Sequence, residues 1–155
     1  MDARLPLPLL LDGAAATNLI EMGMPIDQCP EEWMLDNPDC VIQLHEDFIR
    51  AGSGLLYTPT YNANLEKLSE YGLAHQLERF NRELAQLTKA VAGGRLVAGC
   101  LSSINHEAEP FGELPFLEII ALYAEQAFAL KSGGVDLLVC DSLTSMAQCR
   151  AAILG

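Results

Sequence analysis

Short apolar runs alternate with amphipathic stretches along this chain, and no other feature of the sequence constrains the fold as strongly. Continuous apolar segments occupy residues 7–11, 55–58, 95–103 and 135–142. Apolar residues at helical spacing mark the stretches at 38–51, 77–91, 116–131 and 145–154. Continuous apolar strands separated by helices predict a parallel sheet covered by helices. On the third helix we expect the buried face to consist of Ile120, Ala124, Ala127 and Phe128.

Two architectures fit four consecutive strand-then-helix units: an open doubly wound sheet, or part of a (β/α)8 barrel. Each unit takes about 39 residues, so eight units would need roughly 310, which lies within the usual range of such barrels. We therefore predict an α/β fold of parallel (β/α) units, one domain over residues 1–155, with about four of the eight units of a TIM barrel. A half-barrel leaves two strand edges unpaired, which predicts a homo-oligomer or a second half-barrel chain as partner.

Composition excludes several classes of partner. The net charge is −12 and only nine residues are Lys or Arg, which argues against nucleic acid and against anionic membrane surfaces. No apolar run approaches the length of a membrane-spanning helix, and the N-terminus does not resemble a secretory signal. The five cysteines are scattered and form no CxxC pair, which favours reduced thiols in a cytoplasmic protein.

Polar residues follow the predicted strands, where the loops of a parallel α/β fold gather. Asp12 and Gly13 end the first strand, residues 58–64 follow the second, and Asp141 ends the fourth. An acid at the end of an apolar strand would bind an amine or position a proton. The alternative is that Asp12 and Asp141 only cap the helices that follow them.

Other candidate sites have weaker support. Neither GxGxxG nor GxxxxGK[ST] occurs, and His45 lacks the second histidine of HExxH, so we place it on a helix flank. His106 lies among acids in a segment that we interpret as a solvated loop rather than a metal site. Cys100 and Cys140 each end a strand, and we interpret both as core thiols rather than zinc ligands. Trp33 is interpreted as a hydrophobic anchor of its loop.

Segments 9–23, 29–52, 58–73, 95–103 and 134–142 together resemble, in order and spacing, the homocysteine S-methyltransferase family. The resemblance extends over essentially the whole chain but only over the first half of that family's (β/α)8 barrel. It implies methyl transfer to the thiol of homocysteine, forming methionine, with zinc holding the thiolate. Cobalamin or folate, betaine and S-methylated amino acids are the methyl-donor systems that the family uses.

The resemblance also implies a set of substrate-binding residues: Asp12, Gly13, Thr60, Asn62, Asn64 and Asp141. Asp12 and Gly13 match the positions that contact the amino-acid part of homocysteine. Asp141 falls where the family usually has a glutamate for the substrate's amino group. Residues 60–64 match the loop that faces the substrate or the methyl donor.

The chain departs from the family pattern at the ends of the strands. Ala15 and Ala16 replace the usual Met-Gly, residues 57–61 read Tyr-Thr-Pro-Thr-Tyr in place of Glu-Thr-Asn-Thr-Phe, and Asp-Ser replaces Glu-Thr at 141–142. If the lost glycine was needed for a left-handed backbone, Ala16 carries a penalty. No cysteine matches a zinc-ligand position, because the family's ligands lie on later strands.

Two hypotheses follow. The chain supplies the amino-acid-binding half of a homocysteine S-methyltransferase, with the zinc ligands on the other half. Alternatively, it is an inactive or truncated relative that acts as a small-molecule binding or interaction module. An open sheet that binds another small anion or amine is a third reading.

Overall fold

The computed structural model describes residues 8–155. Its three strands are β1 (Leu55–Tyr57), β2 (Leu96–Ser102) and β3 (Leu137–Asp141). Its α-helices are α1 (Ala15–Glu21), α2 (Pro30–Asp36), α3 (Pro38–Ala51), α4 (Leu65–Glu70), α5 (Leu77–Val91), α6 (Phe116–Ser132) and α7 (Met146–Leu154). A short 3-10 helix, η1 (Ala74–Gln76), precedes α5.

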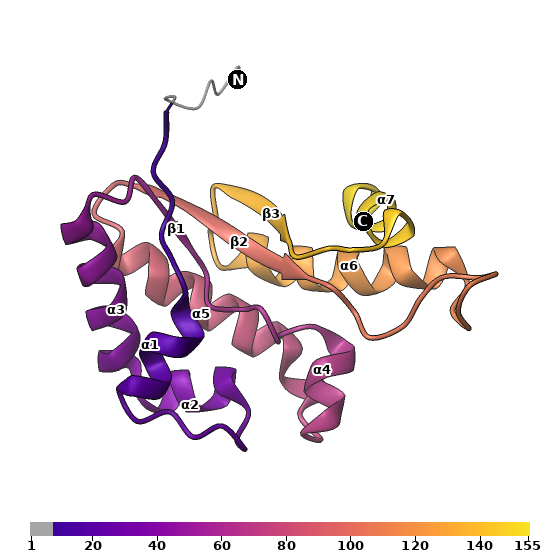
Figure 1. Ribbon diagram of the computed structural model, residues 1–155, viewed down its shortest axis with the longest axis horizontal. Coiled ribbons are helices and arrows are strands. Elements are labelled where there is room, and N and C mark those ends of the chain that lie inside the picture. Colours follow the sequence, from indigo (N-terminus) through magenta and orange to yellow (C-terminus); the bar gives the residue numbers. More distant parts are fainter. Residues whose placement is uncertain (1–7) are drawn as a thin grey trace.

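The three strands form a parallel sheet in the order β1-β2-β3, which confirms the predicted parallel α/β fold. Tyr57 pairs with Ala98, and Ser102 pairs with Asp141. Figure 1 shows α5 and α6 behind the sheet, and both helices contact β2. The opposite face carries Tyr57, Cys100 and Asp141, because alternate residues of a strand point to the same side.

The predicted first strand is reduced to a short pairing with β1. Leu7 lies outside the described residues. Beyond it, Leu10 accepts a hydrogen bond from the backbone N–H of Gly54 at 2.9 Å, and Leu11 forms one parallel bridge with Leu55. Past this bridge the acceptor for β1 is a side chain, because the backbone N–H of Tyr57 donates to the carboxylate of Asp12.

The predicted helices around the sheet are confirmed in position, and α3 ends at Gly52 in the left-handed conformation. The expected buried face of α6 is confirmed only in part: Ile120 and Ala127 are partly buried and pack against the core, but the prediction is wrong for Phe128. Ile119, Tyr123 and Leu130 are buried, whereas Phe128 is 74% exposed. The helix is apolar on several sides, so the spacing of its apolar residues does not select which side is buried. Phe128 lies on the side next to β3, and β3 is the edge strand of the described sheet.

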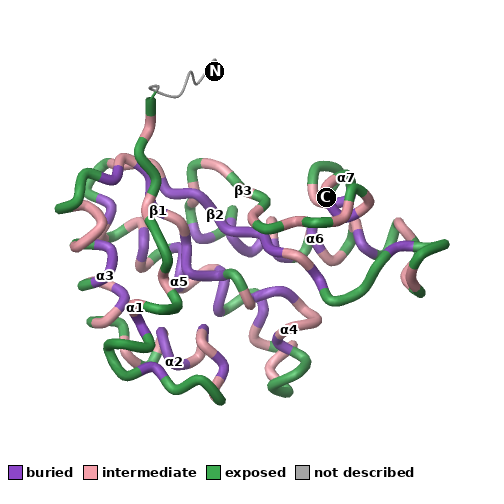
Figure 2. The backbone as a smooth tube through the Cα atoms, viewed as in Figure 1, coloured by how far each residue is buried: buried purple, intermediate pink, exposed green. Residues whose placement is uncertain are grey.

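Two helices on the loops, α2 and α4, are absent from the sequence expectations. Pro30 opens α2, and Asn64 caps α4 by accepting the backbone N–H of Lys67 at 2.9 Å. Trp33 of α2 is buried beside Leu19 and other apolar side chains, so it anchors this region as predicted. Figure 2 shows buried residues concentrated along β1 and β2, whereas the residues of β3 are intermediate or exposed.

None of the helices over residues 8–155 is both long enough and apolar enough to cross a membrane.

Candidate functional site

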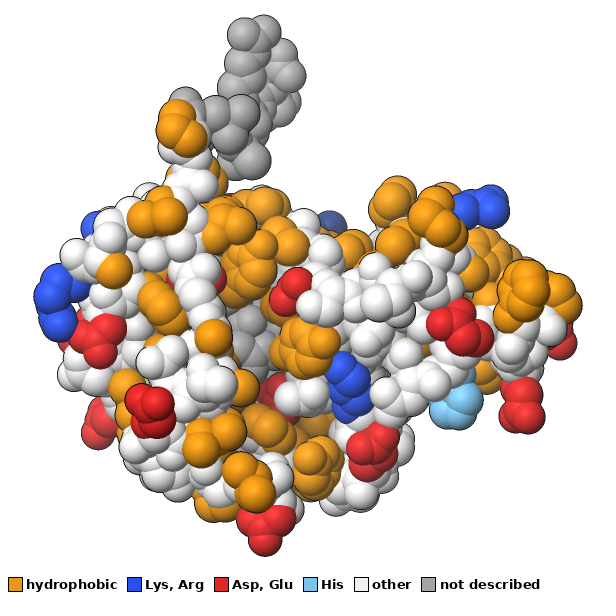
Figure 3. Space-filling view, in the orientation of Figure 1, with side chains coloured by type: hydrophobic (Ala, Val, Ile, Leu, Met, Phe, Trp, Pro, Cys, Tyr) orange, Lys and Arg blue, Asp and Glu red, His pale blue; other side chains and the backbone are white. Residues whose placement is uncertain are grey.

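A pocket of about 330 Å³ lies at the carboxyl ends of the strands. It is bordered by residues 12–17, by Leu44, His45 and Phe48 of α3, by most of residues 57–62, and by Cys100 and Asp141. Figure 3 shows a hollow in this face of the molecule, with hydrophobic side chains around it and acidic side chains at its edge. The predicted residues Asp12, Gly13, Asn62 and Asp141 therefore share one pocket.

Asp12 holds the N-terminal segment against β1. Its Oδ2 accepts a hydrogen bond from the backbone N–H of Tyr57 at 2.8 Å. Burial raises the pKa of Asp12 from 3.8 to about 6, and backbone hydrogen bonds only partly offset that effect. The cap of α1 is Ala14, so Asp12 does not cap the helix that follows it.

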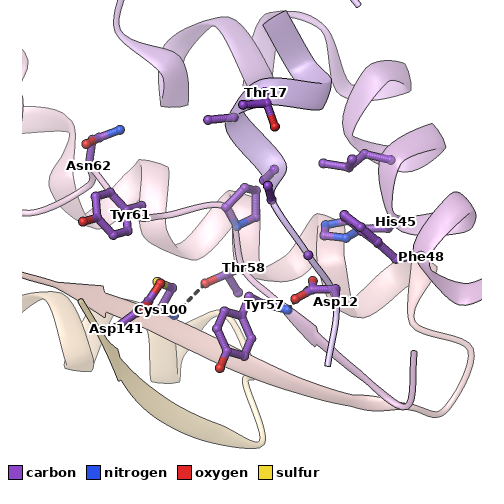
Figure 4. A pocket seen from close by; sticks show the side chains of 16 residues that line it. Asp12, Thr17, His45, Phe48, Tyr57, Thr58, Tyr61, Asn62, Cys100 and Asp141 are labelled. Atoms are coloured by element: carbon purple, nitrogen blue, oxygen red, sulfur yellow. Dashed lines mark hydrogen bonds between the residues drawn. The ribbon is translucent and has the colours of Figure 1, made fainter. Parts of the chain in front are cut away.

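Asp141 ends β3 in register with Ser102 and lines the same pocket (Figure 4). The residue at the cap position of α7 is Ser145, so Asp141 does not cap that helix either. The hydroxyl of Ser142 donates to Asp141 Oδ1 at 3.2 Å, and Ser142 has a left-handed φ of 57°. The helix-capping alternative is thus wrong for both acids, and their carboxylates face the pocket.

Thr60 and Asn64 lie behind the pocket wall. The Thr60 hydroxyl is fully buried and donates to the carbonyl of Cys100 at 3.0 Å. Thr58 Oγ1 lies 2.8 Å from Thr60 Oγ1 and accepts the backbone N–H of Cys100 at 3.0 Å. Asn64 is buried and donates to the carbonyl of Ser103 at 3.3 Å. These side chains continue the β1–β2 pairing beyond the last backbone pair, and so they shape the strand end.

Tyr57 and His45 are among the pocket residues that were not predicted as site residues. Tyr57 lies on the open face of the sheet, between Asp12 and Asp141 (Figure 4), and burial together with these acids raises its pKa. Strand alternation could have identified Tyr57 as a pocket residue. Tyr57 pairs with Ala98, and Ala98 points to the same face of the sheet as Cys100, two residues later. His45 was expected on a helix flank, but it is buried in the pocket wall formed by α3.

His45 is a neutral part of that wall. Its Nε2 lies 3.1 Å from the hydroxyl of Thr88, which also lies 2.9 Å from the carbonyl oxygen of Leu84. Burial lowers the pKa of His45 to about 4. The sequence signal for the position of His45 in the wall is its spacing from Leu44 and Phe48, which places the three residues on one side of α3.

The cysteines beside the pocket differ from each other. Cys100 is buried as predicted, and burial raises its pKa to about 12, so its thiol stays protonated. Cys140 is exposed, so its placement in the core is wrong, since β3 is the edge strand of the described sheet. His106 is exposed and pairs with Glu66 at 2.8 Å. Within residues 8–155, no three His, Cys, Asp or Glu side chains gather in a way that would hold a metal ion.

The acids at the pocket favour a cationic group in the ligand. Asp12 and Asp141 both line the cavity, and the lining residues include neither Lys nor Arg. The rest of the wall is largely apolar, with Phe48, Pro59 and Tyr61 contributing surface. An ammonium group beside an apolar chain therefore fits the chemistry of the pocket.

A family model described as homocysteine S-methyltransferase matches residues 9–155. The methionine synthase of Mycobacterium leprae (strain TN) is 27% identical over 162 residues, covering 93% of this chain and 13% of that protein. The methionine synthase of Mycobacterium tuberculosis (strain H37Rv) is 28% identical with the same coverage. The chain thus spans about an eighth of the length of these curated relatives.

Solved structures of the homocysteine methyltransferase MmuM from Escherichia coli share the fold. The metallated form matches with a TM-score of 0.79 at 25% identity, covering 94% of this chain and 58% of that one. The oxidised form matches with a TM-score of 0.78 at 26% identity, covering 57% of its own length. The chain therefore corresponds to a little more than half of the MmuM chain. With the family match over nearly all of its length, the chain belongs to the homocysteine S-methyltransferase family.

Proposed function

We propose that residues 1–155 form the N-terminal half of a (β/α)8 barrel and supply the amino-acid-binding part of a site that methylates the thiol of homocysteine. The observation that carries the proposal is the meeting of Asp12 and Asp141 in one pocket whose lining includes neither Lys nor Arg. The family membership gives this pocket its substrate class, a homocysteine-like amino acid.

In this proposal the two carboxylates hold the substrate's ammonium group. Asp12 is fixed by its hydrogen bond to Tyr57, so it needs little reordering when the ligand binds. Gly13 lets the chain pass close to α3, because a Cβ there would lie 3.1 Å from Phe48 Cε1. Asn62 offers an amide at the opposite wall, and Phe48 and Tyr61 exclude water from the aliphatic part of the ligand.

Zinc does not fit the described residues. The family resemblance implies a zinc-held thiolate, yet Cys100 is the cysteine at the pocket and burial keeps its thiol protonated. We therefore assign no metal ligand and no catalytic residue to this chain, and we propose that thiol activation belongs to the other half of the barrel. The methyl-donor system, including cobalamin or folate, stays a prediction from the resemblance.

The open edge at β3 supports a second half-barrel as the partner. Leu138 is 42% exposed and Phe128 of α6 is 74% exposed, and both border a hollow beside this strand. An apolar hollow along an unpaired strand is the surface that a further strand-and-helix unit would cover. We propose that the partner half comes from the same polypeptide, from a second copy or from another chain.

Calorimetric titration of the 155-residue chain with L-homocysteine at pH 8 tests the proposal. We expect binding, and we expect Asp12→Asn and Asp141→Asn each to weaken it at least ~10-fold through the loss of a charge-assisted hydrogen bond. Asp39→Asn, at an exposed position on α3, is the matched control and should bind like the wild type. Equal affinity in all four proteins would overturn the site. Binding without methyl transfer, even beside a second half-barrel, would favour the alternative of a binding module.

A further inference from the structure

A buried acid that the proposed reaction does not use lies directly behind the pocket wall. Glu31, the second residue of α2, is 1% exposed. Its Oε1 accepts the backbone N–H of Asn62 at 2.8 Å, and the thiol of Cys29 donates to its Oε2 at 3.7 Å. Burying a carboxylate is costly without strong partners, so this arrangement calls for an explanation.

The peptide group that joins Tyr61 to Asn62 is held from both sides. Its N–H donates to Glu31, while its carbonyl oxygen accepts the hydroxyl of Ser102 and the ammonium group of Lys67, the latter at 3.4 Å. The N–H and C=O of one trans peptide unit point in opposite directions, so the two sets of partners fix the orientation of its plane. Tyr61 and Asn62 both line the main pocket, and this peptide therefore sets part of the pocket's wall.

Glu31 reaches the pocket only through that peptide. It borders a separate cavity of about 70 Å³ whose walls include Ala15, Ala16, Tyr61 and Asn62, residues that also line the main pocket on their other side. Glu31 itself is not among the residues that line the main pocket. It is therefore placed to position the wall rather than to touch a ligand.

No described cation forms an ion pair with Glu31. Lys67 is the cation whose field reaches it, but the Lys67 ammonium group is bonded to Ser102 Oγ at 3.0 Å and lies 4.2 Å from the centroid of the Tyr61 ring. The other titratable groups around Glu31 are Cys29 at the start of α2, Tyr61, and Tyr71 at the end of α4. From α1, only apolar residues border its cavity.

We propose that Glu31 is a positioning residue: its carboxylate orients the Tyr61–Asn62 peptide, and loss of its charge loosens this wall and weakens binding of an amino acid in the pocket. The binding part of this inference rests on the proposed function, whereas the orientation of the peptide does not. A neutral acceptor holds an N–H group less strongly than a carboxylate does. A cation in the pocket favours the charged form of Glu31.

Burial raises the pKa of Glu31 from 4.5 to about 7. The carboxyl therefore changes charge near neutral pH, and the peptide is held most firmly above pH 7. Burial raises the pKa of Asp12 as well, to about 6, so a variant that lacks the Glu31 charge is needed to tell the two acids apart.

The first experiment needs no ligand. In ¹⁵N-labelled wild-type chain, we expect the amide signal of Asn62 to shift with a midpoint near pH 7 as Glu31 ionises. Glu31→Gln keeps an acceptor but no charge, so the signal should not titrate there and the Asn62 amide should exchange with solvent about 5-fold faster at pH 8. Glu32→Gln, on the same turn of α2, is the control and should behave like the wild type. An Asn62 signal without a transition between pH 5 and 9 in the wild type would overturn the proposal.

The second experiment adds L-homocysteine. Wild-type affinity should rise about 5-fold between pH 6.5 and 8, and Glu31→Gln should remove that rise but keep the lower transition that Asp12 causes. If neither protein binds homocysteine while the Asn62 signal titrates as expected, the proposed function fails and the positioning role stands. If binding is normal but Glu31→Gln leaves its pH profile unchanged, the role in ligand binding is wrong.

Discussion

Asp12 and Tyr57 are joined by a hydrogen bond of 2.8 Å from the backbone N–H of Tyr57 to the carboxylate of Asp12. One pocket acid thus replaces the backbone acceptor that a longer first strand would have supplied. The same carboxylate faces the cavity, so a single side chain serves both the fold and the proposed ligand. These two roles respond in opposite ways to the loss of its charge.

We expect Asp12→Asn to stabilise the fold and to weaken ligand binding. The pKa of Asp12 is raised from 3.8 to about 6, so its ionisation disfavours the folded state and stability falls as the pH rises from about 4 to 6. Asparagine keeps an acceptor for Tyr57 and removes the buried charge. At pH 8, after allowance for solvent screening, the free energy of unfolding should increase by about 1 kcal/mol.

Thermal unfolding between pH 3.5 and 8 checks this, and the wild type and variant should converge below pH 4. A variant that is less stable than the wild type at pH 8 would show that the charge itself holds the N-terminal segment.

Thr60→Val should destabilise the chain by about 1–3 kcal/mol, because it removes a buried hydroxyl that donates to the carbonyl of Cys100 and lies 2.8 Å from the hydroxyl of Thr58. Thr60→Ser keeps the hydroxyl and should recover most of that loss. Urea denaturation measures both. Homocysteine affinity, measured on folded protein, should change little. A large loss of affinity at unchanged stability would instead support direct contact between Thr60 and the substrate.

Periodicity predicts the parts of this fold that are determined by simple burial. The helical stripe of α5 and the continuous apolar run of β2 each have one way to bury their apolar residues against the sheet. The buried face of α6 is different, because several of its sides are apolar and tertiary packing chooses Tyr123 over Phe128. Short helices such as α2 are stabilised mainly by tertiary packing, here by the burial of Trp33. The spacing of apolar residues therefore does not predict them.

The site is predictable at the strand ends and less so behind them. Asp12 and Asp141 follow apolar strands, and the topology of a parallel sheet brings such ends together. Glu31 has no comparable signal: it sits in a polar-looking segment, and only the path of the chain brings its carboxyl to the Asn62 amide. The expected penalty at Ala16 does not arise, because this residue lies in α1, and Ser142 is the non-glycine residue with positive φ among those described.

Gly133→Ala should destabilise the chain by about 2–3 kcal/mol. Gly133 has an ordinary helical φ of −76°, but a Cβ there would lie 2.5 Å from Ala85 Cβ and 2.8 Å from the carbonyl oxygen of Arg82. The close approach of α5 and α6 therefore requires glycine at this position. Gly134→Ala is the matched control: its φ of +89° costs about 1 kcal/mol, while nothing lies within 4 Å of the added atom. Chemical denaturation of both variants tests this, and a smaller loss at Gly133 than at Gly134 would contradict it.

Phe128→Glu should abolish self-association of the chain. Phe128 borders the hollow beside β3, where Leu138 is also exposed, and an apolar surface along an unpaired strand promotes pairing. Size-exclusion chromatography with light scattering at micromolar concentration should give the wild type a mass above the 16.8 kDa of one chain and the variant a mass near it. Ile26→Glu removes a similarly exposed apolar side chain between α1 and α2, away from the sheet edge, and should associate like the wild type.

A folded wild-type monomer would contradict pairing between copies. The partner half would then have to come from the same polypeptide or from a different chain, and a separately produced half-barrel should bind the wild type and not the Phe128 variant.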